Sequence, residues 1–182
     1  MSKSHSLFIA DAIDTLIRRA GQLFSLGYLL LIGVIILQVV LRKGFANGLI
    51  ALEELQWHLY AVGVMFGVSY AQITNTHVRV DLFYHRFSDK TKSIVEIFGI
   101  LFFMLPFMFV VFYHSLEFVY EAWRVNESSD SPSGLPWRWL VKSVIPASFF
   151  LLMLATLSRL IREVAALQGK KSTMSNIIDV SS

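Results

Sequence analysis

Four long apolar segments constrain this sequence more than any other feature, because each is long enough to cross a lipid bilayer as a helix. They cover residues 20–41, 55–78, 97–116 and 139–161. The first three contain no Asp, Glu, Lys or Arg, and the fourth carries its basic residues only near its ends. A soluble domain of 182 residues could not bury so much apolar surface, with 55% hydrophobic residues and a mean hydropathy of +0.59. The sequence therefore predicts an all-α integral membrane protein with four transmembrane helices.

Two shorter helices are predicted at the membrane interface. Residues 5–19 place six apolar side chains on one helical stripe, and such a helix lies at the bilayer surface: Phe8, Ile9, Ala12, Ile13, Leu16 and Ile17. Residues 49–57 are only moderately apolar, which favours a short interfacial helix between the first two spans. Residues 1–168 then form a single four-helix membrane domain, and the polar residues 169–182 are expected to be a flexible cytoplasmic tail.

The distribution of charge predicts how the chain is oriented. Eleven of the sixteen lysine and arginine residues fall on the side that holds both termini and the loop between the second and third spans. Cytoplasmic segments are enriched in these residues, so both termini are expected in the cytoplasm. The net charge of +3 is explained by these flanking cations, and we expect no nucleic-acid partner. The absence of cysteine excludes disulfides, thiolate catalysis and cysteine-ligated metals.

The apolar segments contain no acidic or basic residue at mid-depth, which disfavours a transporter that works alone. Two histidines allow a different function. His58 and His114 fall at similar predicted depths, as bis-imidazole haem ligation in a helical bundle would need. Each could instead be an ordinary interfacial histidine beside aromatic residues, and this is the interpretation we favour. A haem-binding membrane anchor subunit of a respiratory complex remains the alternative.

Two groups of residues are candidates for packing or partner contacts. Glu53 and Glu54 stand at the start of the second span, where acids interact favourably with the helix dipole, or where they could bind a basic surface of a partner. Gly63, Gly67 and Ala71 recur at every fourth position and form a ridge that lets another helix approach closely. That second helix could belong to the same chain or to a partner.

Four sequence stretches occur in a characteristic order: VVLRKGF, ALEELQWHLY, HVRVDLFYHRFS and GLPWRW. Each is weak alone. Their order and spacing over residues 30–161 resemble the small (DctQ-like) membrane subunit of tripartite ATP-independent periplasmic (TRAP) transporters. By position, Glu53 and Glu54 match one recurring stretch of that family, and His77, Arg79 and Asp81 match another.

The resemblance implies a function without catalysis. In that family a large membrane subunit carries a sodium-coupled elevator, and a periplasmic substrate-binding protein captures the cargo, typically an organic acid. The small subunit acts as a static scaffold in the bacterial inner membrane, in contact with membrane lipid and with its partners. We therefore expect no catalytic residue, no metal and no cofactor in this chain. A helper with tight helix packing and no charge at mid-depth suits this task on physical grounds as well.

Overall fold

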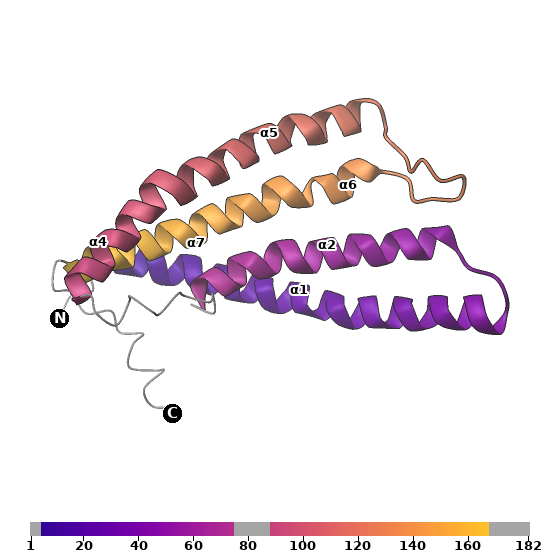
Figure 1. The fold of residues 1–182 in the computed structure, drawn as a ribbon, viewed down its shortest axis with the longest axis horizontal. Coiled ribbons are helices and arrows are strands. Elements are labelled where there is room, and N and C mark those ends of the chain that lie inside the picture. Colours follow the sequence, from indigo (N-terminus) through magenta and orange to yellow (C-terminus); the bar gives the residue numbers. More distant parts are fainter. Residues whose placement is uncertain (1–4, 75–87, 168–182) are drawn as a thin grey trace.

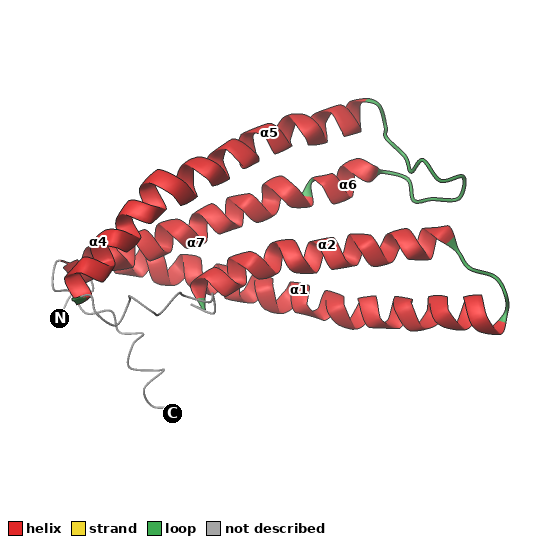
Figure 2. Cartoon of the chain, in the orientation of Figure 1, coloured by secondary structure: helices red, strands yellow, loops and turns green. Residues whose placement is uncertain are grey.

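The computed structural model describes residues 5–74 and 88–167, and these residues form helices joined by short loops (Figure 2). The helices are α1 (His5–Gly44), α2 (Ile50–Ile73), α4 (Asp89–Gly99), the π-helical turn η1 (Ile100–Met104), α5 (Leu105–Arg124), α6 (Arg138–Lys142) and α7 (Val144–Leu167). The prediction of an all-α protein is confirmed for this part of the chain. The predicted tail, residues 169–182, lies outside the described residues.

Helix α1 is one continuous element of 40 residues, about 60 Å long at 1.5 Å per residue. It contains no proline, so nothing in its sequence forces a break between residues 5–19 and the first predicted span. The separate interfacial helix expected over residues 5–19 is therefore not confirmed. Arg42 and Lys43 occupy the last turn, where cations interact favourably with the helix dipole.

The short interfacial helix expected over residues 49–57 is not a separate element, because α2 begins at Ile50 and its first turns include residues 50–57. Helix α2 follows α1 after a short connection and runs back alongside it as an antiparallel hairpin (Figure 1). Phe24 of α1 stacks on Phe66 of α2, with ring centroids 3.8 Å apart. This aromatic contact joins the two helices of the hairpin.

Proline residues account for both irregularities in the second half of the chain. Pro106 lacks an N–H and its ring crowds the carbonyl of Phe102, so the turn before it widens into η1, where the Leu105 N–H donates to Ile100 O five residues back. Pro146 removes the bond to Lys142 O in the same way, and the helix is interrupted at Ser143 between α6 and α7.

Helix α7 is the centre of the arrangement. It packs against α1 and α2 on one side and against α5 on the other, so α5 and the hairpin lie on opposite sides of it (Figure 1). The start of α1 and the end of α7 lie at one end of the molecule. The connections 45–49 and 125–137 lie at the opposite end, which we call the loop end.

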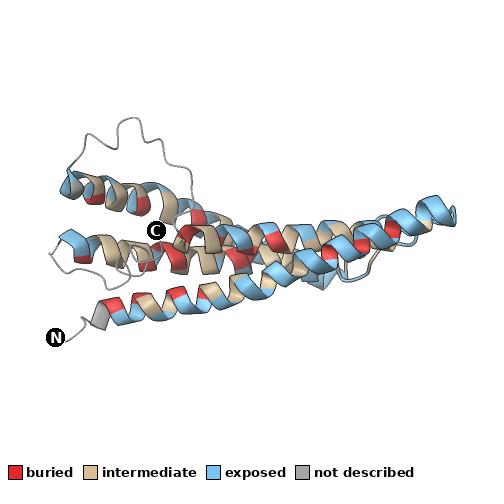
Figure 3. Ribbon diagram, turned by 90° about the horizontal axis from the view of Figure 1, so that it is seen from below, coloured by how far each residue is buried: buried red, intermediate tan, exposed pale blue. Residues whose placement is uncertain are grey.

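Buried residues form a minority along the helices (Figure 3), and small or polar side chains are frequent among them, while many large apolar side chains are exposed. Ser69, Ser148 and Thr156 are at most 2% exposed, whereas Phe103 is 68% exposed. Helices in membranes pack through small residues, because lipid already solvates the large apolar ones. The distribution of residues is therefore that of a protein whose solvent is a bilayer.

Three stretches of the described chain are long and apolar enough to span a membrane: Leu7–Gly44, Lys90–Arg124 and Arg138–Leu167. Helix α2 is long enough, at 24 residues or about 36 Å, but it is not among them. Its polar side chains, including Gln56 and His58, lower its hydropathy. The predicted span over residues 55–78 is therefore not confirmed as a fourth crossing, and its last residues lie outside the described part of the chain.

Candidate functional site

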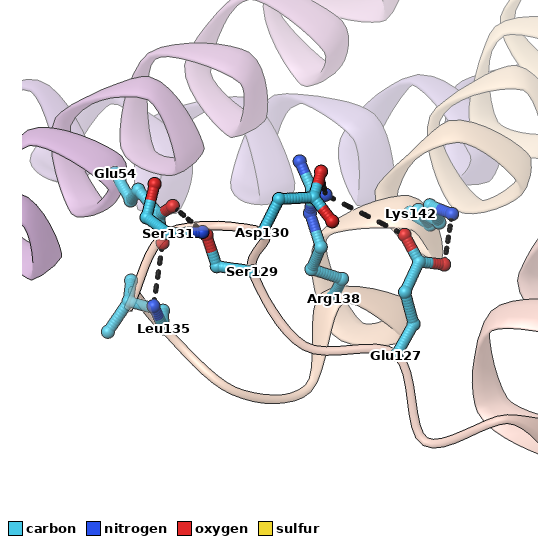
Figure 4. Close-up of polar contacts among 8 residues, drawn as sticks. All are labelled: Glu54, Glu127, Ser129, Asp130, Ser131, Leu135, Arg138 and Lys142. Atoms are coloured by element: carbon cyan, nitrogen blue, oxygen red, sulfur yellow. Dashed lines mark hydrogen bonds and ion pairs between the residues drawn. The ribbon is translucent and has the colours of Figure 1, made fainter. Parts of the chain in front are cut away.

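The carboxylate of Glu54, in the first turns of α2, holds the 125–137 loop in place (Figure 4). Oε1 accepts a hydrogen bond from the Ser129 hydroxyl, and Oε2 accepts one from the Leu135 backbone N–H at 2.6 Å. A single carboxylate thus connects both sides of the loop to α2. We call the loop and this carboxylate the loop clamp.

Bonds within the loop close it around the carboxylate. The Ser131 N–H donates to Ser129 Oγ at 3.2 Å, and the Ser129 N–H donates to Leu135 O at 3.2 Å. Gly134 is required by this close approach, since a Cβ there would lie 2.3 Å from Ser129 Cβ and 2.8 Å from Glu54 Oε1. The loop therefore has a defined conformation that depends on Glu54 and Gly134 together.

The hydrogen bonds of the loop clamp favour the charged form of Glu54. The Ser129 hydroxyl lowers the pKa of the carboxyl below its ordinary value of 4.5, and the Leu135 N–H lowers it further. Desolvation acts in the opposite direction, and the charges of His58 and Arg138 add smaller lowering effects. Glu54 is therefore an anion that accepts hydrogen bonds at neutral pH.

A cluster of ion pairs fixes the loop to α6 on its other side (Figure 4). Lys142 Nζ pairs with Glu127 Oε2, and it also lies 4.0 Å from the centroid of the Phe118 ring of α5. Arg138 Nη1 lies 3.4 Å from Asp130 Oδ2 and 3.8 Å from Glu127 Oε1. These contacts join the end of α5, the loop and α6 into one unit.

Glu53 has a different partner from its neighbour, because adjacent residues of a helix point about 100° apart. Its Oε1 accepts from Gln38 Nε2 at 3.2 Å and lies 3.5 Å from Arg42 Nη1, both on α1. Gln38 Oε1 in turn accepts from the Leu49 N–H at 3.4 Å. Glu53 thus links the two helices of the hairpin, while Glu54 links α2 to the loop.

The three small residues of the predicted ridge do not share one contact. Gly63 is buried against Tyr28 of α1, where a Cβ would lie 2.5 Å from Tyr28 Cζ. Gly67 is exposed, and a Cβ added there would have nothing within 4 Å, while Ala71 is half-buried. A glycine that the sequence pattern missed makes a second close approach, since a Cβ on Gly21 would lie 2.5 Å from Tyr70 Cδ2.

Three further predicted residues, His77, Arg79 and Asp81, lie outside the described residues. The two histidines of the haem alternative do not meet at one cavity. His58 lines a cavity of about 660 Å³ between α2 and the helices α5, α6 and α7, together with Met65 and Ile145. His114 is exposed on α5 and does not line it. The arrangement of the described residues does not support haem ligation by this pair.

A polar cluster that the sequence pattern did not predict lies at the end opposite the loop end. Asp14 is 5% exposed and accepts from the Ser158 hydroxyl at 2.6 Å and from Arg162 Nη2 at 2.7 Å, while Asp11 accepts from the same nitrogen at 2.8 Å. Nearby, Arg159 Nη2 pairs with Glu96 Oε1 at 2.5 Å. The cluster joins the first turns of α1 to α4 and the end of α7.

This cluster shows which face of the first turns of α1 packs against the bundle. Phe8, Ile9 and Leu16 of the predicted stripe are 64%, 50% and 54% exposed, whereas Ile17 of the same stripe and the acidic Asp14 are buried in the bundle. The signal was present in the sequence, since Ala10, Asp14 and Ile17 recur at helical spacing. If residues 5–19 are treated as part of the first span, with lipid on most of the apolar stripe, these three residues identify the face that packs in the bundle.

These features define a multi-pass helical membrane protein whose charged residues gather at its two ends. A family model described as "Tripartite ATP-independent periplasmic transporters, DctQ component" matches residues 31–166. The chain belongs to this family of transporter components, and the resemblance noted in its sequence is confirmed. No curated protein sequence matches the chain significantly.

Proposed function

We propose that this chain is the static scaffold of a TRAP transporter. In this proposal it binds the large elevator-type membrane subunit, and the complex takes up an organic acid that a periplasmic binding protein delivers, in symport with sodium. The family assignment supports a small permease subunit. The scaffold role is inferred from the distribution of charge and of exposed apolar surface described below.

The observation that carries the proposal is the uncharged middle of the bundle. Among the described residues, Asp, Glu, Lys and Arg are absent from the central parts of the four long helical segments, residues 20–41, 55–73, 97–116 and 144–158. Charged residues within transmembrane segments are the usual mark of a path for an anionic cargo or a coupling ion. The transport path is therefore assigned to another subunit.

The exposed face of α4, η1 and α5 supports a partner within the membrane. Only 11% of the residues in the most apolar part of Lys90–Arg124 are buried. Helix α5 packs on α6 and α7 and has no comparably extensive contact with the hairpin of α1 and α2. Phe102 and Phe107 on this run are 65% and 64% exposed. We assign this face to the large subunit, with lipid covering the remaining apolar surface.

The topology completes the proposal. With α2 as a fourth crossing, both termini lie on one side, and the excess of lysine and arginine there places them in the cytoplasm of a bacterial cell. The loop end then faces the periplasm, with Trp57, Trp123 and Trp137 (72%, 60% and 58% exposed) in the aromatic belt. The loop clamp would meet the binding protein there. His77, Arg79 and Asp81 would act on the cytoplasmic side.

Reconstitution in liposomes tests the scaffold role. The chain alone should give no sodium-driven uptake of organic acids, whereas the chain with its large subunit and binding protein should give uptake that ceases when the chain is omitted. Sodium-driven flux through the chain alone would reject the proposal. A variant that removes the exposed aromatic face, Phe102→Ser with Phe107→Ser, should lower co-purification with the large subunit.

A further inference from the structure

A recess of about 300 Å³ lies between α1 and α2 near the loop end. Ile35 and Val39 of α1 form its apolar wall and are 40% and 54% exposed. Arg42, Glu53 and Gln56 lie on its polar side. The recess is therefore apolar toward the middle of the membrane and polar toward its surface, the same order of chemistry as in a phospholipid.

The polar side of the recess has a guanidinium with few acceptors. Arg42 uses one long contact, 3.5 Å to Glu53, although a guanidinium carries five N–H donors and its side chain is 68% exposed. A guanidinium presents its N–H donors in a planar fork that matches a pair of phosphate oxygens.

The same recess has an acceptor suited to a cation. Glu53 Oε1 accepts hydrogen bonds from Gln38 and Arg42, whereas no described residue donates to Oε2. The Glu53 side chain is 47% exposed. The indole of Trp57, 72% exposed, lines the recess beside it, and an aromatic face attracts an ammonium group. A carboxylate next to a guanidinium matches a headgroup with both charges better than one with a negative charge alone.

We propose that this recess binds phosphatidylethanolamine. Its phosphate would accept hydrogen bonds from Arg42, its primary ammonium would donate to Glu53 beside Trp57, and its acyl chains would lie over Ile35 and Val39. The proposal requires only that the chain spans a bilayer. It is independent of the proposed scaffold role, and neither depends on the other being correct.

Native mass spectrometry of the full-length chain in mild detergent tests this binding, with equal amounts of dioleoyl phosphatidylethanolamine, phosphatidylcholine and phosphatidylglycerol added. The wild-type chain should retain phosphatidylethanolamine about fivefold more than either other lipid, the effect of one added charge-assisted contact. Arg42→Gln should lower its retention, and Glu53→Gln should lower it to the level of phosphatidylcholine.

Arg124→Gln is the matched control, because Arg124 also pairs with a glutamate near the loop end, at 2.6 Å from Glu121, and its side chain is 61% exposed. It should leave lipid retention unchanged. Equal retention of phosphatidylglycerol, or an equal effect of Arg42→Gln and Arg124→Gln, would overturn the proposal. Competition by soluble glycerophosphoethanolamine at the same concentration would show a site for free phosphoesters instead, and would overturn it as well. The side chain of Arg42 is exposed, so its variant should fold and tests lipid binding directly.

Discussion

Glu54 Oε2 accepts the backbone N–H of Leu135 at 2.6 Å, across a separation of 81 residues in sequence. The contact joins two of the stretches that carry the family resemblance, ALEELQWHLY and GLPWRW. An acid at the start of a helix would interact favourably with the helix dipole alone. Here it also fixes the conformation of the loop that joins α5 to α6.

Replacing Glu54 by Gln should release the loop. The amide keeps one acceptor oxygen but loses the charge that strengthens both hydrogen bonds. We expect faster hydrogen exchange at Leu135 and Ser131 and faster proteolysis within residues 126–136, with helix content unchanged. Glu53→Gln is the matched control, since its partners lie on α1, and it should leave the loop protected. Equal exchange in the two variants would contradict the loop clamp.

The loop clamp should also weaken in acid. Because the folded pKa of Glu54 is lowered below 4.5, its stabilising contribution is present above that value and is lost as the pH falls through the lowered pKa. Loop protection measured by exchange should therefore be constant near neutral pH and decline only below about 4.5. The Glu54→Gln variant should show no such decline at this loop.

Gly134→Ala should destabilise the loop because its Cβ would overlap Ser129 and Glu54. We expect a loss of about 1–3 kcal/mol, the usual cost of overpacking a tight site. Gly33→Ala provides the comparison, since a Cβ there has nothing within 4 Å and the helix gains about 1 kcal/mol of propensity. Chemical or thermal unfolding in detergent measures both, and a stable Gly134→Ala protein would show that the close approach is relaxed in solution.

The two ridge glycines should differ in their effect on the stability of the chain. Gly63→Leu meets Tyr28 and should lower the thermal stability of the isolated chain. Gly67→Leu faces open space and should leave that stability unchanged. Since we assign the large subunit to the face of α4, η1 and α5, Gly67→Leu should also leave co-purification with that subunit unchanged. Loss of co-purification in Gly67→Leu, with normal melting of the isolated chain, would place the partner on α2 and contradict that assignment.

Arg162→Leu should disrupt the cluster that holds α1 against α7. It leaves Asp14 buried without this cation, and breaking a buried pair costs about 3–5 kcal/mol. We expect the lower part of that range, because Arg162 itself retains 20% exposure. The double variant Asp14→Leu with Arg162→Leu should recover part of the lost stability, as measured by thermal unfolding. A single variant as stable as wild type would contradict the burial of this pair.

Much of the fold follows from local properties of the sequence. Long uncharged apolar runs can satisfy their backbone groups in lipid only as helices, so the helical class follows from hydropathy. Pro106 and Pro146 disturb the helix wherever they occur, because a missing N–H does not depend on tertiary context. The residues that matched the family stretches were likewise sufficient to predict membership of the family.

Tertiary structure alone decided how those residues are used. The sequence placed Glu53 and Glu54 side by side without indicating that one contacts α1 and the other the 125–137 loop. It placed Gly63 and Gly67 on one ridge, although only Gly63 meets a bulky partner, Tyr28. It predicted a separate surface helix over residues 5–19, whereas Asp14 pairs with Arg162 and draws that helix into the bundle. Each outcome depends on contacts between residues far apart in the chain, and the spacing of residues within one helix does not specify which distant residue will face it.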